Sequence, residues 1–71
     1  MLAVELGRAI KERRNTLKIT QPHVADLAGI SLNTLYKIER GQANPTIEVL
    51  EKLLDVLGLQ ISIHTKKTIP L

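Results

Sequence analysis

Two short segments, each beginning with a helix-capping residue and separated by a tight turn, constrain this chain more than any other feature. The side chains of Thr20 and Ser31 are of the kind that caps helix N-termini, because their hydroxyl oxygens accept a hydrogen bond from the first turn. Gly29 lies two positions before Ser31 and can take the left-handed conformation in which helices often end. The spacing predicts one helix at about residues 21–28 and a second that Ser31 caps and that ends at Gly41.

The residues around this turn have the sizes that a close crossing of two helices requires. Ile19 and Val24 flank the first capping residue, and Ile30 and Leu35 flank the second. This is the spacing of a hydrophobic staple, which sets the angle at which the chain runs into a helix. Ala25 is small enough for the two helices to approach each other near the turn. We therefore expect a helix-turn-helix unit.

Further helices are predicted on both sides of this unit. Leu6, Ile10 and Leu17 recur at helical spacing, which predicts a first helix over about residues 3–17. Thr46 is another capping residue, and a wide aliphatic stripe follows it. This stripe predicts a last helix that stops before glycine 58. Its residues are Val49, Leu50, Leu53, Leu54 and Leu57.

The hydrophobic period changes after Gly58, where apolar and polar residues alternate and predict a β-strand. A strand cannot satisfy its backbone groups alone, and no other segment has a strand pattern. We therefore expect it to pair with the same strand of a second copy, as a homodimer. The alternating apolar residues are Leu59, Ile61 and Ile63. The expected division is a helix-turn-helix domain, a dimerisation strand and a tail, at residues 1–58, 59–65 and 66–71.

Composition argues against several classes of function. The chain of 71 residues has no cysteine and one aromatic residue, Tyr36, which disfavours base stacking on single strands and a ring-lined ligand pocket. His23 and His64 are far apart and lack nearby cysteine or paired carboxylates, so we expect no metal and no cofactor. A nucleophile, base and acid cannot be assembled convincingly from the remaining residues, and we expect no enzyme activity.

Charge and hydropathy indicate the type of partner. Residues 1–41 contain seven Lys and Arg and four Asp and Glu, whereas residues 42–71 contain three of each. The formal net charge of +3 therefore lies with the helix pair, as contact with a polyanion requires. No window approaches about 18 consecutive apolar residues, and the N-terminal charge follows its apolar run, the reverse of a secretory signal. We expect a soluble, cytoplasmic, nucleoid-associated protein without a membrane partner.

The second helix of the pair leaves one face for another molecule. Leu35 and Ile38 have the spacing of core residues, so the side chains around them point outward. In a helix-turn-helix, these reach base edges in the major groove. Asn33 suits adenine, Lys37 suits guanine, and Leu32 suits a thymine methyl group.

Other residues complete the candidate surface for double-stranded DNA. Gln21 and the N–H groups at the start of its helix are placed for phosphate. Tyr36 suits a phosphate contact or the edge of the core, and Lys37 and Arg40 also fit as solvated charges. A structural hairpin that binds no ligand has the same spacing and is the alternative interpretation. The candidate DNA contacts are Gln21, Ser31, Leu32, Asn33, Thr34, Tyr36, Lys37, Arg40 and Asn44.

Over about 55 of its residues the chain resembles the Xre-like helix-turn-helix regulators, the family of the Cro and lambda-type phage repressors. The resemblance rests on Leu6-Gly7, Ile10, Arg14, Leu17, Thr20-Gln21, Val24-Ala25, Ala28-Gly29-Ile30-Ser31, Leu35, Ile38-Glu39-Arg40-Gly41, Pro45 and Leu57-Gly58. It implies an all-α, compact, lambda-repressor-like domain of four or five helices, with a recognition helix at residues 31–39, that binds a palindromic operator as a dimer. It also implies that Arg14 pairs with Glu39, which makes Arg14 a structural residue. The structural positions of the family are here Arg14, Ala25, Gly29, Glu39 and Gly41.

The C-terminal end resembles a narrower group. A minimal Xre-like domain followed by one apolar strand is similar to the HipB-like antitoxins, whose C-terminal strands pair across the dimer. Such antitoxins repress their own operon and bind a HipA-type kinase toxin, which implies these roles here. The alternatives are an interaction module that mainly neutralises the kinase, and an orphan or phage-type repressor without a toxin. Pro22, Leu32 and Tyr36 depart from the usual family residues, which leaves the operator sequence open.

Overall fold

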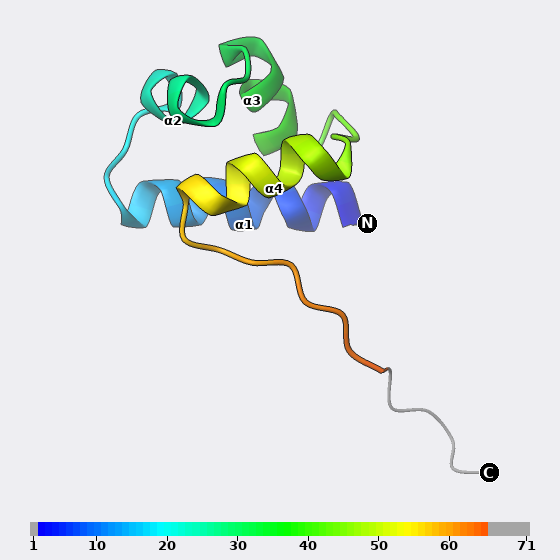
Figure 1. Cartoon of the computed structure of the whole chain (residues 1–71). Helices are drawn as coiled ribbons and strands as arrows, with labels where there is room; N and C mark the ends of the chain where they lie inside the picture. Colours follow the sequence, from blue (N-terminus) through cyan, green and yellow to red (C-terminus); the bar gives the residue numbers. More distant parts are fainter. Residues whose placement is uncertain (1, 66–71) are drawn as a thin grey trace, which may run out of the picture.

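The computed structural model describes residues 2–65, and this range contains four α-helices and no strand (Figure 1). The helices are α1 (Leu2–Thr16), α2 (Gln21–Ala28), α3 (Leu32–Glu39) and α4 (Ile47–Val56). The expected all-α class and the positions of all four predicted helices are confirmed. None of these helices has the length and apolar composition needed to cross a membrane.

Local hydrogen bonds explain where three of the helices begin. The hydroxyl of Thr20 accepts a hydrogen bond from the backbone N–H of His23 at 3.3 Å. Thr46 accepts one from the N–H of Val49 at 3.2 Å, and Ser31 caps α3 in the same way at 3.0 Å. Each cap satisfies an N–H group for which the helix itself has no acceptor.

All four helices are followed by a residue with positive φ: Lys18 (58°), Gly29 (69°), Gly41 (71°) and Gly58 (68°). The N–H of the next residue then donates to a carbonyl five positions back, at 2.8 to 3.2 Å. This is the Schellman arrangement, which gives partners to carbonyls at the helix end. Among the described residues, Lys18 alone adopts a positive φ without being glycine, and its Cβ makes that conformation costly.

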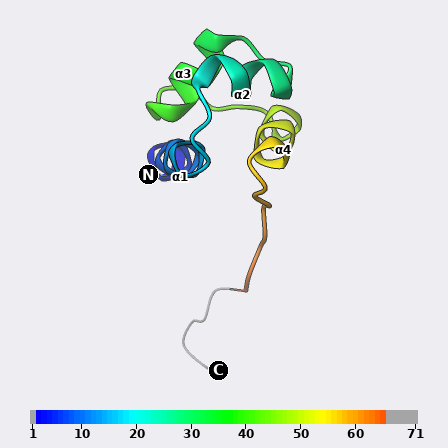
Figure 2. The same cartoon turned by 90° about the vertical axis from the view of Figure 1, so that its left-hand side faces the viewer.

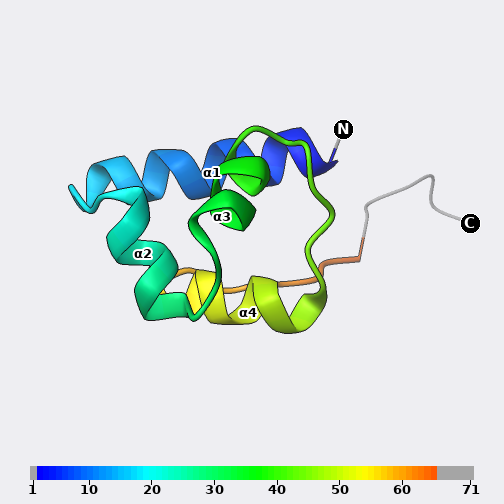
Figure 3. The same cartoon turned by 90° about the horizontal axis from the view of Figure 1, so that it is seen from above.

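The helices form two layers. α2 and α3 lie on one side of the molecule, and the chain after α4 leaves on the opposite side (Figures 1 and 2). Seen from above, α3 lies between α1 and α4 (Figure 3). The side that carries α2 and α3 is therefore not covered by the described part of the C-terminal segment.

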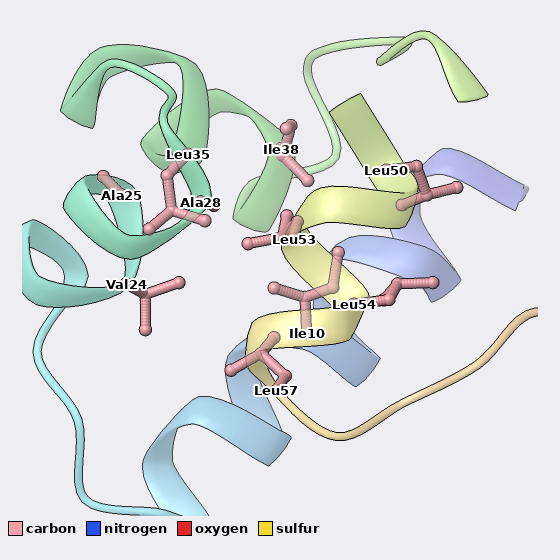
Figure 4. Packing of buried hydrophobic residues seen from close by; sticks show 10 residues of the cluster. All are labelled: Ile10, Val24, Ala25, Ala28, Leu35, Ile38, Leu50, Leu53, Leu54 and Leu57. Carbon is pink, nitrogen blue, oxygen red and sulfur yellow. The ribbon is translucent and has the colours of Figure 1, made fainter. Parts of the chain in front are cut away.

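Aliphatic side chains from all four helices make up the core (Figure 4). Ile10 of α1, Leu35 of α3 and Leu53 of α4 are fully buried, and burial of one such side chain contributes about 1.5–3 kcal/mol. Ile19 and Ile30 pack against this cluster from the segments that lead into α2 and α3. Both helices of the unit are thus held from their N-terminal ends, as the staple spacing predicts.

The C-terminal segment differs from the prediction. Residues 59–65 form no strand and have no regular secondary structure. A strand needs the backbone groups of a neighbour, and no other described segment is a strand that would supply them. Leu59 packs against the core, whereas the side chain of Ile63 is 94% exposed. The predicted tail at residues 66–71 lies outside the described residues.

Candidate nucleic-acid interface

The two faces of α3 differ sharply in burial. Leu35 and Ile38 are 0% and 1% exposed, because they pack into the core. The side chains that the sequence places on the other face are all exposed, so their predicted outward orientation is confirmed. These residues are Leu32, Asn33, Tyr36 and Lys37.

A buried ion pair attaches α3 to α1. Arg14 Nε lies 2.7 Å from Glu39 Oε2, and Arg14 Nη2 lies 3.0 Å from Glu39 Oε1. The side chains are 12% and 2% exposed. Arg14 Nη1 also donates to the carbonyl of Ile19 at 2.9 Å, just before the cap of α2. One guanidinium thus joins three elements, and the implied Arg14–Glu39 pair is present.

The environment of Arg14 favours its charged form. Its hydrogen bonds to Glu39 raise its pKa, against the opposing effect of partial burial. Because the folded pKa lies above the unfolded one, the contribution of this group to stability is complete below the unfolded pKa. It is lost only as the solution becomes more alkaline than the folded pKa. The pair therefore holds α3 in place throughout the neutral and mildly alkaline range.

Gln21, the first residue of α2, extends this network to the surface. Its Nε2 donates to Glu39 Oε1 at 3.1 Å. An amide nitrogen has two donors and its oxygen is an acceptor, so this bond uses one of the donors. Gln21 therefore helps to position α3 and still has polar atoms left for a ligand, a double role that sequence reasoning missed.

The hydroxyl groups at the start of α3 bond to each other. Ser31 Oγ accepts the backbone N–H of Thr34 at 3.0 Å, and the two side-chain oxygens lie 2.7 Å apart. Because only one of the two hydroxyls donates in that contact, the proton of the other is available to an acceptor outside the helix. This pair lies beside the outward face.

Arg40 and Tyr36 form a second pair at the other end of α3. Arg40 Nη1 donates to the Tyr36 hydroxyl at 2.7 Å, and the guanidinium carbon lies 5.2 Å from the ring centroid. The phenol oxygen accepts this bond and keeps its own proton for donation. Both side chains are exposed, so the pair presents positive charge and a hydroxyl donor on the same surface.

A hollow of about 420 Å³ lies between the start of α2 and the outward face of α3. Four of the predicted contacts, Gln21, Leu32, Asn33 and Tyr36, line it. Sequence spacing assigned Gln21 of α2 to phosphate and Leu32 and Asn33 of α3 to bases. The structure places these residues around one hollow. Asn44, in contrast, lies exposed in the loop between α3 and α4.

Close packing behind α3 depends on small residues. Gly7 of α1 is buried against the end of α3, where a Cβ atom would clash with the carbonyl oxygen of Ile38 and lie 2.9 Å from that of Glu39. Gly41 packs in a similar way, since a Cβ there would lie 3.0 Å from Val4. Ala25 is 3% exposed in the contact of α2 with the core.

Arg13 has a role that the sequence did not indicate. Its Nε donates to the carbonyl of Leu57 at 2.8 Å and so caps the end of α4. Sequence reasoning identified no partner for Arg13, because Arg13 and Leu57 are 44 positions apart.

The predicted dimer residues Ile61 and Ile63 lie in the segment that leaves on the side away from α2 and α3 (Figures 1 and 2).

The described part of the chain contains no candidate metal-ion site. Within residues 2–65, no group of three or more His, Cys, Asp or Glu side chains is placed to hold an ion. His64 instead lies within 3.0 Å of the Ser62 hydroxyl.

Comparison with known proteins gives consistent results. A family model described as Helix-turn-helix matches residues 10–63. An immunity repressor protein of Bacillus phage phi105 is 39% identical over 57 residues, which are 80% of this chain and 40% of the repressor. An HTH-type transcriptional regulator of Haemophilus influenzae is 39% identical over 62 residues, which are 87% of this chain and 63% of the regulator. The chain therefore spans less than two thirds of either relative.

A solved structure has the same arrangement of helices. The restriction-modification controller protein C.AhdI from Aeromonas hydrophila matches with a TM-score of 0.78 and 28% sequence identity. The match covers 82% of this chain and 88% of that protein.

Proposed function

Because this chain belongs to the Xre-type helix-turn-helix family, whose model matches residues 10–63, we propose that it binds double-stranded DNA sequence-specifically and represses transcription. The observation that carries this function is the outward face of α3. Its side chains are exposed while the opposite face is fixed in the core, and the Arg14–Glu39 pair sets the angle of the helix. A helix presented in this way suits the major groove.

Each candidate contact has a role that its chemistry supports. Asn33 and Lys37 read base edges, and Leu32 contacts a methyl group. Gln21, Arg40 and the Ser31–Thr34 hydroxyl pair contact phosphates, because they carry donors or positive charge beside that face. Asn44 reaches the backbone from the loop after α3.

The bound form is a homodimer on a palindromic operator. One recognition helix of each subunit enters the major groove, with half-sites about 34 Å apart or a multiple of that distance. The C-terminal segment supports this assembly, because Ile61 and Ile63 are 47% and 94% exposed in the single chain. Apolar side chains this exposed gain free energy when a second copy covers them.

Selection from a pool of random duplexes with the full chain tests this function. We expect a palindromic sequence to be enriched and to bind more tightly than a shuffled duplex of the same composition. Equal affinity for the selected and shuffled duplexes, or no enrichment, would contradict sequence-specific binding. A reporter gene placed behind the selected duplex then tests repression, which requires lower expression when the protein is present.

The role of antitoxin and autorepressor is a finer proposal, and a second observation favours a protein partner. A groove of about 460 Å³ lies between α4 and the segment after it, lined by Leu54, Leu59 and Ile61 together with charged residues. A kinase toxin bound at this groove would leave α3 free, because the C-terminal segment lies on the other side of the molecule (Figure 2).

Gene neighbourhood and co-expression distinguish an antitoxin from an orphan regulator. An adjacent HipA-type kinase gene whose toxicity is relieved by this chain would support the antitoxin. We would also expect relief to persist in a variant that no longer binds DNA, if neutralisation is the main role. Absence of any kinase gene beside this one would favour the orphan or phage-type repressor.

A further inference from the structure

The hollow between α2 and α3 has one apolar and one polar wall. Leu32 and Tyr36 are separated by one helical turn and are 47% and 44% exposed, so they form a continuous apolar strip. Gln21 and Asn33, which carry amide side chains, line the same hollow. A ligand that is complementary to both walls must carry a small apolar group beside hydrogen-bonding atoms.

One side chain in each wall of the hollow is held in place before anything binds. The Tyr36 hydroxyl accepts a hydrogen bond from Arg40 at 2.7 Å, and the guanidinium of Arg40 lies near the ring at 5.2 Å from its centroid. The Gln21 amide is fixed by its bond to Glu39, which itself is held by Arg14. Binding therefore costs little ordering of these side chains.

Among base pairs viewed from the major groove, only one kind has this combination of groups. Thymine presents a C5 methyl group and an O4 acceptor, while its partner adenine presents the N6 donor and N7 acceptor that an asparagine amide matches. A cytosine–guanine pair has neither the methyl group nor the adenine edge.

On the basis of the proposed DNA-binding function, we propose that this hollow receives the 5-methyl group of one thymine in each half-site, with Asn33 on the paired adenine. Leu32 and Tyr36 contact this methyl group, and operator affinity falls when it is absent.

Substitution in the DNA tests this directly, without altering the protein. In the duplex selected from the random pool, each thymine is replaced in turn by deoxyuridine, which removes the methyl group and leaves the pairing intact. We expect one position in each half-site at which affinity falls about fourfold, the equivalent of burying one methyl-sized group. Fluorescence anisotropy with the full chain measures the change.

A protein variant and a matched control identify the residue responsible. L32A should lose most of the preference for thymine over deoxyuridine, because only Tyr36 then contacts the methyl group. Leu27 of α2 is also exposed, at 57%, but does not line the hollow, so L27A should keep the preference for thymine. Thermal unfolding of both variants shows that they are folded. A preference that persists unchanged in L32A would overturn the assignment.

The remaining outcomes separate this inference from the function on which it rests. Tight binding to the selected duplex with no effect of any deoxyuridine would contradict the methyl site and leave DNA recognition standing. Failure to select any duplex would contradict both. Replacing the thymine–adenine pair by 5-methylcytosine–guanine should not restore full affinity, because Asn33 loses its adenine. Full restoration would overturn the pairing with adenine.

Discussion

Arg14 and Glu39 lie 25 residues apart in the sequence, and two hydrogen bonds of 2.7 and 3.0 Å join their side chains. Gln21 adds a third contact to the same carboxylate. The position of the recognition helix therefore depends on a charge pair whose carboxylate has almost no access to water.

We expect R14A to lower the free energy of unfolding by about 3 kcal/mol, because it leaves the Glu39 carboxylate buried without its cation. The free energy of unfolding of R14K should lie between those of R14A and the original chain. Lysine keeps the positive charge, but its ammonium group cannot form the two parallel bonds. Urea denaturation measures both. K11A removes a charge from an exposed position of the same helix and should change stability little. Loss of DNA binding in R14A without loss of stability would instead make Arg14 a contact residue.

G7A should destabilise the protein by about 1–3 kcal/mol, because the new methyl group clashes with backbone oxygens at the end of α3. The usual effect of Gly to Ala inside a helix is stabilisation by about 1 kcal/mol, so the sign of the change is diagnostic. Thermal unfolding measures the change, and we expect a lower melting temperature for G7A than for the original chain. A higher melting temperature for G7A would show that α1 and α3 do not approach this closely.

K18G should raise stability by about 1 kcal/mol, because Lys18 has a φ of 58° after α1 and glycine adopts this conformation freely. N15G, which places glycine inside α1, serves as the control and should lower stability by roughly 0.3 kcal/mol, because glycine and asparagine lie about 1 and about 0.7 kcal/mol below alanine in helix propensity. Urea denaturation checks the prediction: relative to the original chain, the midpoint of K18G should rise and that of N15G should fall.

N33A and K37A should each weaken binding to the selected duplex by about 1–3 kcal/mol if each side chain reads a base. Their melting temperatures should change little, since both residues are exposed. R8A, an exposed change on α1, controls for the loss of one positive charge. Gel-shift titration measures the affinities, and an unchanged value for either variant removes that residue from the reading surface.

Replacing both Ile61 and Ile63 by lysine should weaken the dimer, because charge then lies where a second copy would cover apolar side chains. The double variant Q60K and S62K adds the same two charges at the exposed polar positions of the segment and is the matched control. Sedimentation over a range of concentrations measures dissociation. Truncation after Gly58 is a less direct test, because it also removes Leu59 from the core. An unchanged dimer after replacement of Ile61 and Ile63 would place the interface elsewhere.

Features that depend on neighbours in the sequence were predictable. Thr20, Ser31 and Thr46 cap their helices through residues three positions away, and Gly29 ends α2 within the same turn. These contacts form once a helix forms, so spacing alone identifies them. The outward orientation of Lys37 and its neighbours follows from helical periodicity in the same way.

Features that depend on distant contacts were harder to predict. The bond from Arg13 to the Leu57 carbonyl and that from Gln21 to Glu39 join different helices, and local patterns contain no information on such pairs. Gly7 is an intermediate case, since a glycine inside a helix costs about 1 kcal/mol and so points to a close approach. The strand failed as a prediction because a strand needs the backbone groups of a neighbour, and no described segment of the same chain is a strand that supplies them.

The division of α3 into a buried and an exposed face has a consequence for how such proteins diversify. Leu35, Ile38 and Glu39 maintain the fold, whereas Leu32, Asn33 and Lys37 contribute little to the core. On the proposed function, mutations at these exposed positions change the recognised DNA sequence at small cost in stability. A duplicated copy of this gene then acquires a new operator through a few substitutions in one short helix, and a designer can follow the same route.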